Sequence, residues 1–176
     1  MGKNLFRRLG SSLLPKHQAA KAAPSVLSRG ARVPEEFQLN LSTEWRENPS
    51  NDPTQWLFSS ASKQSSAIVS LMQIHVKRER LLDVAEEVAN RRRAAEVQAR
   101  SGRGVEFGDN WVELKDDGEL GHVAYAGYDD QTIFRFMAWV TQAKILNLYV
   151  ETETRENAFA EAVFDEVFSG FRFYVP

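Results

Sequence analysis

The sequence predicts an α+β fold, an antiparallel β-sheet meander flanked by a long helix and by a Phe-rich C-terminal helix. Residues 111–152 hold four apolar-rich segments joined by short turns, which is typical of consecutive antiparallel strands. Residues 79–100 and 156–169 instead repeat apolar side chains at helical spacing. These two patterns together define the fold class. The remaining segments are assigned by the apolar surface that each of them must cover.

Three further strands are expected before the long helix. Residues 36–41 alternate apolar and polar side chains, residues 55–60 form a short apolar run, and residues 67–76 are rich in β-branched residues. Residues 42–54 contain two Asx-Pro steps, which exclude a helix and predict a loop. Trp45 in this loop is expected to anchor it on the core.

The long helix, residues 79–100, carries Leu81, Ala85 and Val88 on one side. The apolar stripe fades in the second half, which includes three consecutive arginines at 91–93. Two interpretations of these arginines remain open. They form a solvated face favoured by the negative end of the helix dipole, or a patch that binds an anion or nucleic acid.

The C-terminal helix, residues 156–169, is strongly apolar. Phe159, Val163 and Val167 recur four positions apart, so the helix needs an apolar surface to cover. The alternating residues at 171–173 predict a final extended segment that packs on the core.

Pairing rules predict which residues of the meander share a face of the sheet. A tight turn at 117–118 and a two-residue turn at 129–130 set the first two hairpins. For the third hairpin we expect an odd-length loop at 142–144, which pairs Val140 with Leu146. The even alternative pairs apolar residues with polar ones.

This register separates an apolar face from a mixed face. The apolar face comprises Val112, Leu114, Val123, Tyr125, Phe134, Phe136, Ala138, Val140, Leu146, Leu148 and Val150. The mixed face comprises Trp111, Glu113, His122, Ala124, Ala126, Ile133, Arg135, Met137, Trp139, Ile145, Asn147 and Tyr149. The C-terminal helix is the expected cover of the apolar face.

The mixed face is the candidate binding surface. In one interpretation the long helix covers it and its polar groups are satisfied at the margin. In the other it is partly open and binds a protein partner, such as a hydrophobic helix or peptide, because Trp, Tyr, Met and Arg are enriched at protein interfaces. The predicted partner-binding residues are Trp111, His122, Arg135, Met137, Trp139, Asn147 and Tyr149.

The sequence contains no motif that supports catalysis. There is no cysteine, and the three histidines lack metal-ligand spacing. His122 beside Glu113 forms a potential ion pair without an evident nucleophile. We therefore expect no enzyme activity, no cofactor and no metal. After residue 34 the chain has 15 basic and 24 acidic side chains, which argues against nucleic-acid binding.

Residues 1–34 form a basic tail with seven Lys or Arg and no acid, ahead of a single α+β domain at 35–176. Leu5, Phe6, Leu9 and Leu13 could share one side of a short helix. The tail is either disordered, a transit peptide, or a segment that binds a membrane surface or a partner. A cytoplasmic location is expected, with a mitochondrion or plastid as the alternative.

Four segments carry a resemblance to a known fold: FQLNLSTEW at 37–45, SAIVSLMQIHV at 66–76, residues 132–152, and FDEVFSGFRF at 164–173. With these, residues 36–174 resemble the PsbP-like fold, an α/β/α sandwich, and in particular the DcrB-like bacterial proteins. The basic tail departs from that group, whose lipoproteins carry a signal and a lipid-accepting cysteine.

The resemblance implies a binding module without enzyme activity. Proteins of this fold serve as photosystem assembly subunits, binders of a small GTPase, and chaperones of type VI secretion effectors. The first hypothesis is accordingly an adaptor or chaperone, including a chaperone of secretion effectors. An organelle-imported assembly factor with a cleavable presequence, a small-molecule or lipid carrier, and a toxin-immunity protein remain as alternatives.

Overall fold

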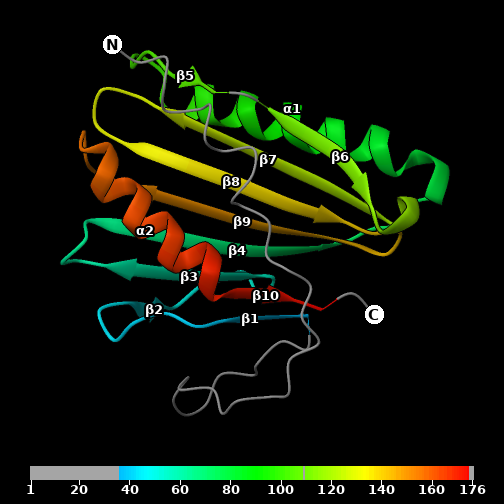
Figure 1. Cartoon of the computed structure of the whole chain (residues 1–176), viewed down its shortest axis with the longest axis horizontal. Helices are drawn as coiled ribbons and strands as arrows, with labels where there is room; N and C mark the ends of the chain where they lie inside the picture. The colour runs from blue at the N-terminus through cyan, green and yellow to red at the C-terminus, as the bar shows by residue number, and fades with distance from the viewer. Residues whose placement is uncertain (1–35, 109, 175–176) are drawn as a thin grey trace.

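A large antiparallel sheet lies between two helices, α1 and α2, which pack on its opposite faces (Figure 1). The structure, a computed structural model, describes residues 36–108 and 110–174. The tail predicted at residues 1–34 lies outside the described residues. The predicted fold class is confirmed.

The elements follow the predicted order, with two short additional strands, β2 in the segment expected to be a loop and β5 after the long helix. They are β1 (Phe37–Leu39), β2 (Arg46–Asn48), β3 (Gln55–Ser60), β4 (Ser65–Gln73), η1 (Arg78–Arg80), α1 (Leu81–Ala99), β5 (Glu106–Phe107), β6 (Trp111–Lys115), η2 (Asp116–Gly118), β7 (Leu120–Tyr128), β8 (Ile133–Val140), β9 (Lys144–Thr152), α2 (Asn157–Gly170) and β10 (Phe171–Phe173).

The main sheet has the strand order β2-β3-β4-β9-β8-β7-β5, and β6 pairs with β7 beside β5. The meander of β6 to β9 therefore forms one half of the sheet, and β4 joins it through β9 (Figure 1). The strands β1 and β10 form a separate two-stranded ribbon. This ribbon brings the two ends of the described chain together.

Gly170 makes the close approach of α2 to β1 feasible. A Cβ at this position would lie 2.1 Å from the carbonyl oxygen of Asn40, whose amide donates a hydrogen bond to the carbonyl of Gly170. Phe37 of β1 stacks on Phe171 of β10 within the core. Trp45 is buried in the same core, which confirms its predicted anchoring role.

The first two hairpins keep the predicted faces. Glu113 pairs with His122, as expected. In the second hairpin Tyr128 pairs with Ile133 rather than Gln131, because the loop has four residues instead of two. A shift of two positions leaves each side chain on its predicted face.

The third hairpin corrects the predicted register. Val140 pairs with Ile145, so the loop at 141–144 has an even number of residues. Thr141 closes it: its amide donates to the carbonyl of Lys144, and its side-chain oxygen accepts from the amide of Lys144 at 3.0 Å. The odd-length loop predicted at 142–144 is wrong, and every side chain of β9 lies on the face opposite to the one expected.

The expected covers of the two faces are also reversed. The long helix α1 packs through Leu81, Ala85 and Ala89 on the face that carries Val123 and Phe136. The C-terminal helix α2 packs on the other face.

That face carries Met137 and Trp139 together with Leu146, Leu148 and Val150 of β9. Each helix has an apolar stripe, so the choice between faces depends on the tertiary context.

Candidate functional site

The structure separates the seven predicted partner-binding residues. Trp111, His122, Arg135, Met137 and Trp139 lie on the α2 face. Asn147 and Tyr149 lie on the α1 face, because of the corrected register of β9. The seven residues therefore do not form one surface.

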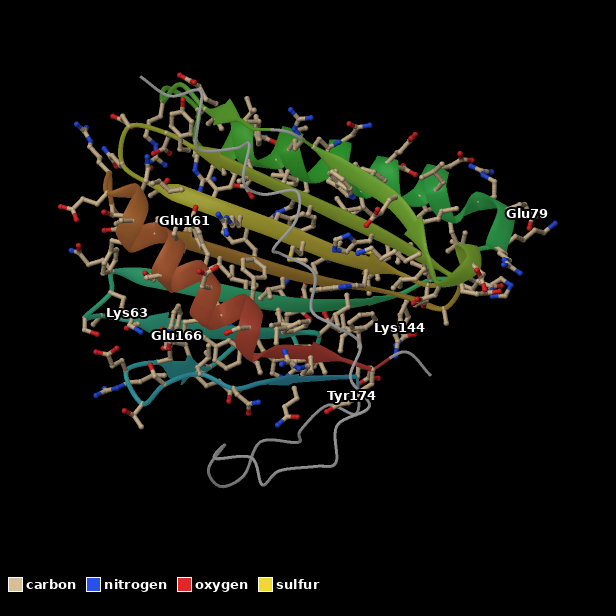
Figure 2. The ribbon with its side chains drawn as sticks, in the orientation of Figure 1. Lys63, Glu79, Lys144, Glu161, Glu166 and Tyr174 are labelled. Carbon is tan, nitrogen blue, oxygen red and sulfur yellow. The ribbon has the colours of Figure 1, made fainter. Side chains whose placement is uncertain are left out.

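The α2-face residues, except Trp111, are buried. Trp139 stacks on Phe171 and lies against Phe173, each with ring centroids 5.0 Å apart. Arg135 donates to Glu161 of α2, and its guanidinium carbon lies 4.7 Å from the Phe164 ring. Figure 2 shows Glu161 and Glu166 on α2, with Lys63 beside Glu166. These contacts fasten α2 to the sheet and leave no open surface among the described residues on this part of the face.

His122 is buried in the neutral form. Its Nδ1 lies 3.6 Å from Glu113 Oε1, and neither ring nitrogen has a hydrogen-bond partner within the described residues. Burial and the charge of Lys115 lower the pKa of His122 from 6.5 to about 4, although Glu113 opposes the shift. The unfolded chain therefore binds a proton at His122 between pH 6.5 and pH 4, whereas the folded chain does not.

Replacing His122 by glutamine is expected to flatten the dependence of stability on pH. The free energy of unfolding of the unmodified protein should fall by about 1 kcal/mol more per pH unit between pH 6 and pH 4.5 than that of His122→Gln. Urea denaturation at each pH measures this slope. His75→Gln, at an exposed histidine, is the control and should keep the original slope. Equal slopes for all three proteins would contradict a neutral buried His122.

The open part of the sheet lies on the α1 side. Because α1 packs over β6, β7 and β8, the same face of β3 and β4 is left without a helical cover among the described elements. On β4 the α2-facing Ala67 and Val69 are fully buried. The α1-facing Ile68 and Ser70 are only partly buried, and Met72 is 56% exposed.

A groove of about 480 Å³ runs between α1 and this uncovered part of the sheet. One wall is a helical stripe of α1, and the floor consists of alternate residues of β4, β9 and neighbouring strands. The residues of the wall are Val84, Glu87, Val88, Arg91, Arg92 and Ala95. The floor and margin comprise Gln55, Ile68, Ser70, Met72, Ile74, Phe136, Ile145, Asn147 and Tyr149.

The floor contains one polar pair, Asn147 and Ser70, which face each other on neighbouring strands. Asn147 Nδ2 donates to Ser70 Oγ at 3.1 Å, and Asn147 Oδ1 accepts no hydrogen bond from the described residues. The surrounding surface is mainly aliphatic and aromatic. The groove can thus hold an apolar group, and the buried Asn147 Oδ1 lies beneath its floor.

A buried charged cluster closes one end of the groove. Arg100, the C-terminal cap residue of α1, donates to Tyr149 Oη at 2.7 Å and to Glu151 at 2.8 Å, and also pairs with Glu96. Burial and the carboxylates of Glu151 and Glu96 raise the pKa of Tyr149 above its usual range. Tyr149 therefore stays a neutral phenol that links α1 to β9.

The three consecutive arginines do not all behave as a solvated face. The guanidinium carbon of Arg92 lies 4.8 Å from the Tyr149 ring, and that of Arg93 lies 4.7 Å from the Phe107 ring. The side chain of Arg91 is 80% exposed and pairs with Glu87. Arg91 alone among the three fits the predicted solvated face.

The groove was missed from the sequence although α1 contains a signal for it. Val84, Val88, Arg91 and Ala95 recur at spacings of four, three and four, beside the stripe that packs on the sheet. A second stripe on one helix indicates a second neighbour. The partly polar alternation of β4 carries the matching signal, because one side of that strand is not fully apolar.

These features define a PsbP-like fold with an open groove beside its long helix. The chain is similar to the solution structure of cyanobacterial PsbP (CyanoP) from Synechocystis sp. PCC 6803, with 16% identity, coverage of 85% of this chain and 99% of that chain, and a TM-score of 0.55. The predicted resemblance to the PsbP-like fold is confirmed.

A crystal structure from Bacteroides thetaiotaomicron is 11% identical over 79% of this chain and 45% of that chain, with a TM-score of 0.36. No family model and no curated protein matches the sequence. Within residues 36–108 and 110–174, no helix is long and apolar enough to cross a membrane.

Proposed function

We propose that this protein is a binding module without enzyme activity, an adaptor or chaperone that holds an apolar helical segment of a protein partner in the groove between α1 and the sheet. The observation that carries the proposal is the uncovered α1 side of β4, where Met72 is 56% exposed beside Ile68 and Ile74. The proposal replaces the surface predicted from the sequence, most of which is buried beneath α2.

The dimensions of the groove suit a helix. The sheet is about 29 Å wide at its normal strand spacing, whereas one helix with its side chains is about 10–12 Å across. Since α1 covers only the side near β7, the remaining width accommodates a second helix. The wall from Val84 to Ala95 is about 16 Å long, which corresponds to three turns. An amphipathic helix laid into an apolar groove is a recurrent mode of peptide recognition.

Replacing Met72 by glutamate is expected to reduce capture of the partner at least about tenfold. A carboxylate on the groove floor would be desolvated by the bound segment without a partner, and that cost exceeds about 1.4 kcal/mol. Affinity capture from native lysate with the full chain, quantified by mass spectrometry, measures the effect. Val88→Glu, on the wall that α1 forms, should reduce capture of the same partner protein by the same factor.

Val97→Glu is the matched control, because Val97 is 52% exposed on α1 but does not line the groove. It should retain capture. A partner retained by Met72→Glu and Val88→Glu would place the binding surface elsewhere and refute the proposed site.

A small-molecule or lipid carrier is the second candidate. It is favoured by the volume of about 480 Å³, which lies within the range of small-ligand pockets. Native mass spectrometry of the purified full chain separates the two candidates. A bound mass that is absent from Met72→Glu would favour the carrier, whereas a ligand-free chain that captures a protein favours the adaptor.

A further inference from the structure

We infer that the groove binds its helical segment antiparallel to α1, with acidic residues in the first turn of that segment lying against Arg91. This inference rests on the proposed function and specifies the chemistry and direction of the partner. It follows from the unequal ends of the groove, which differ in both charge and apolar character.

The direction of α1 along the groove is established by contacts at each end. Near the start of α1, a Cβ on Gly121 would lie 3.1 Å from Ala85 Cβ and 3.2 Å from Val140 Cβ. Val140 pairs with Ile145, and Ile145 pairs with Met72. The first turns of α1 therefore lie at the Met72 end.

The other end of α1 lies over the opposite end of the groove. There Arg100 contacts Tyr149, which pairs with Ile68. One end of the groove is thus aliphatic, formed by Ile74, Met72, Ile145 and Val84. The other end carries Tyr149 together with Arg91 and Arg92.

At the arginine end, the guanidinium groups of Arg91 and Arg92 lie outside the carboxylate of Glu96. The side chain of Arg91 is 80% exposed, and that of Arg92 is 37% exposed. Glu96, which pairs with Arg92 and Arg100, has a side chain that is 4% exposed. A partner that approaches this end meets guanidinium groups before it meets the carboxylate of Glu96.

Arg91 can change partner at little cost. Its ion pair with Glu87 lies one helical turn apart on the same helix, and both side chains are more than half exposed. Such surface pairs contribute little to stability, because water screens the charges. A carboxylate on a bound segment can therefore replace Glu87 as the ion-pair partner of Arg91. The new pair would be less hydrated than the exposed pair with Glu87.

The helix dipole selects the antiparallel direction. The C-terminal end of α1, at Arg100, carries the negative end of its dipole, and an antiparallel neighbour places its positive N-terminal end nearby. Acidic side chains are favoured in the first turn of a helix for the same reason. In an antiparallel segment, the same carboxylates interact favourably with the N-terminal end of their own helix and with Arg91. In a parallel segment, the acids that reach Arg91 would lie at the C-terminal end of their own helix, where the helix dipole disfavours negative charge.

The test uses two synthetic, hydrocarbon-stapled 14-residue helices with identical leucine faces. One has two glutamates in the first turn and two lysines in the last, and the other has these charges exchanged. Stapling makes both helices equally ordered, so affinity differences report on the groove. Fluorescence anisotropy with the full chain should show that the peptide with glutamates first binds at least about fivefold more tightly.

Direction is measured separately by disulfide trapping. The chain contains no cysteine, so Ala95→Cys and Ile74→Cys each introduce a single thiol at one end of the groove. A peptide with an N-terminal cysteine should form a disulfide with Ala95→Cys, under mild oxidation by diamide, and not with Ile74→Cys. Arg91→Glu should abolish the preference between the two peptides, whereas Arg155→Glu, at an exposed arginine ahead of α2, should leave it unchanged.

The outcomes distinguish the inference from the function on which it rests. Equal affinities, or trapping by Ile74→Cys, would overturn the antiparallel orientation while leaving the groove as the binding site. Binding of both peptides that is insensitive to Met72→Glu would overturn the site itself. Tighter binding of the peptide with glutamates first, lost in Arg91→Glu and trapped at Ala95→Cys, supports the inference.

Discussion

Replacing Arg100 by methionine is expected to lower the free energy of unfolding by about 3–5 kcal/mol. Arg100 is buried and pairs with Glu96, Glu151 and Asp129. Methionine fills much of the volume but leaves these carboxylates without their shared cation, and removal of one member of a buried ionic group carries a cost of this size. Urea denaturation at neutral pH measures the loss.

Arg91→Met is the matched control. Arg91 lies on the same helix but is largely exposed, so its removal should change the free energy of unfolding by less than about 0.5 kcal/mol.

A double-mutant cycle adds a second criterion. Glu96→Gln combined with Arg100→Met should cost at least about 1 kcal/mol less than the sum of the single changes, because the glutamine removes one of the buried carboxylates that lose Arg100. Additive costs would show that Glu96 and Arg100 are not coupled.

Replacing Trp139 by alanine is expected to destabilise the protein by a similar amount, about 3–5 kcal/mol. Trp139 is buried between the sheet and β10, against Phe171 and Phe173. Its removal leaves a large cavity and loosens the strand that follows α2. Thermal and urea denaturation, with near-ultraviolet circular dichroism to follow aromatic packing, measure the effect.

Trp111→Ala provides the comparison, because Trp111 is 49% exposed at the edge strand β6. It should cost no more than about 1 kcal/mol. This pair of tryptophans separates a structural role from a binding role for the surface predicted from the sequence. If Trp139→Ala retained normal stability but lost partner capture, the face beneath α2 would be the binding surface instead of the groove.

The register of the third hairpin could not be obtained from the sequence because β9 is apolar on both faces. Leu146 and Leu148 pack under α2, whereas Ile145 and Tyr149 pack toward α1. Where the turn sequence does not determine the pairing, alternation is the remaining signal, and a strand buried on both sides lacks it. Preferring an apolar partner over Asn147 for Ala138 therefore selected a register that is wrong by one residue.

The first hairpin was predictable because its turn carries local information. Asp117 and Gly118 both adopt positive φ, which favours Gly and Asp, and the turn sequence alone determined the pairing of Glu113 with His122. The second hairpin illustrates an intermediate case. Asp129 Oδ1 accepts from the amides of Gln131 and Thr132, which extends the turn by two residues without exchanging the faces.

The groove exists because no helix among the described elements covers the α1 side of β3 and β4. No local sequence pattern encodes this missing cover. The sequence indicates that α1 and α2 are amphipathic. It does not indicate that one helix is too narrow to cover the whole face of the sheet on which α1 packs. On the other side, the ribbon of β1 and β10 and the loop around Trp45 supplement α2. The pairing of β1 with β10 joins segments that are far apart in the sequence, so the periodicity of side chains could not predict it either.

The ribbon of β1 and β10 also has a consequence for how the protein is made. The hydroxyl of Tyr174 donates to Gln38, a residue 136 positions earlier in the chain. During translation β1 is synthesised first, and its partner strand is among the last described residues to leave the ribosome. A nascent chain therefore cannot close the Trp139 side of its core until β10 has left the ribosome, and this aromatic surface stays uncovered up to that point.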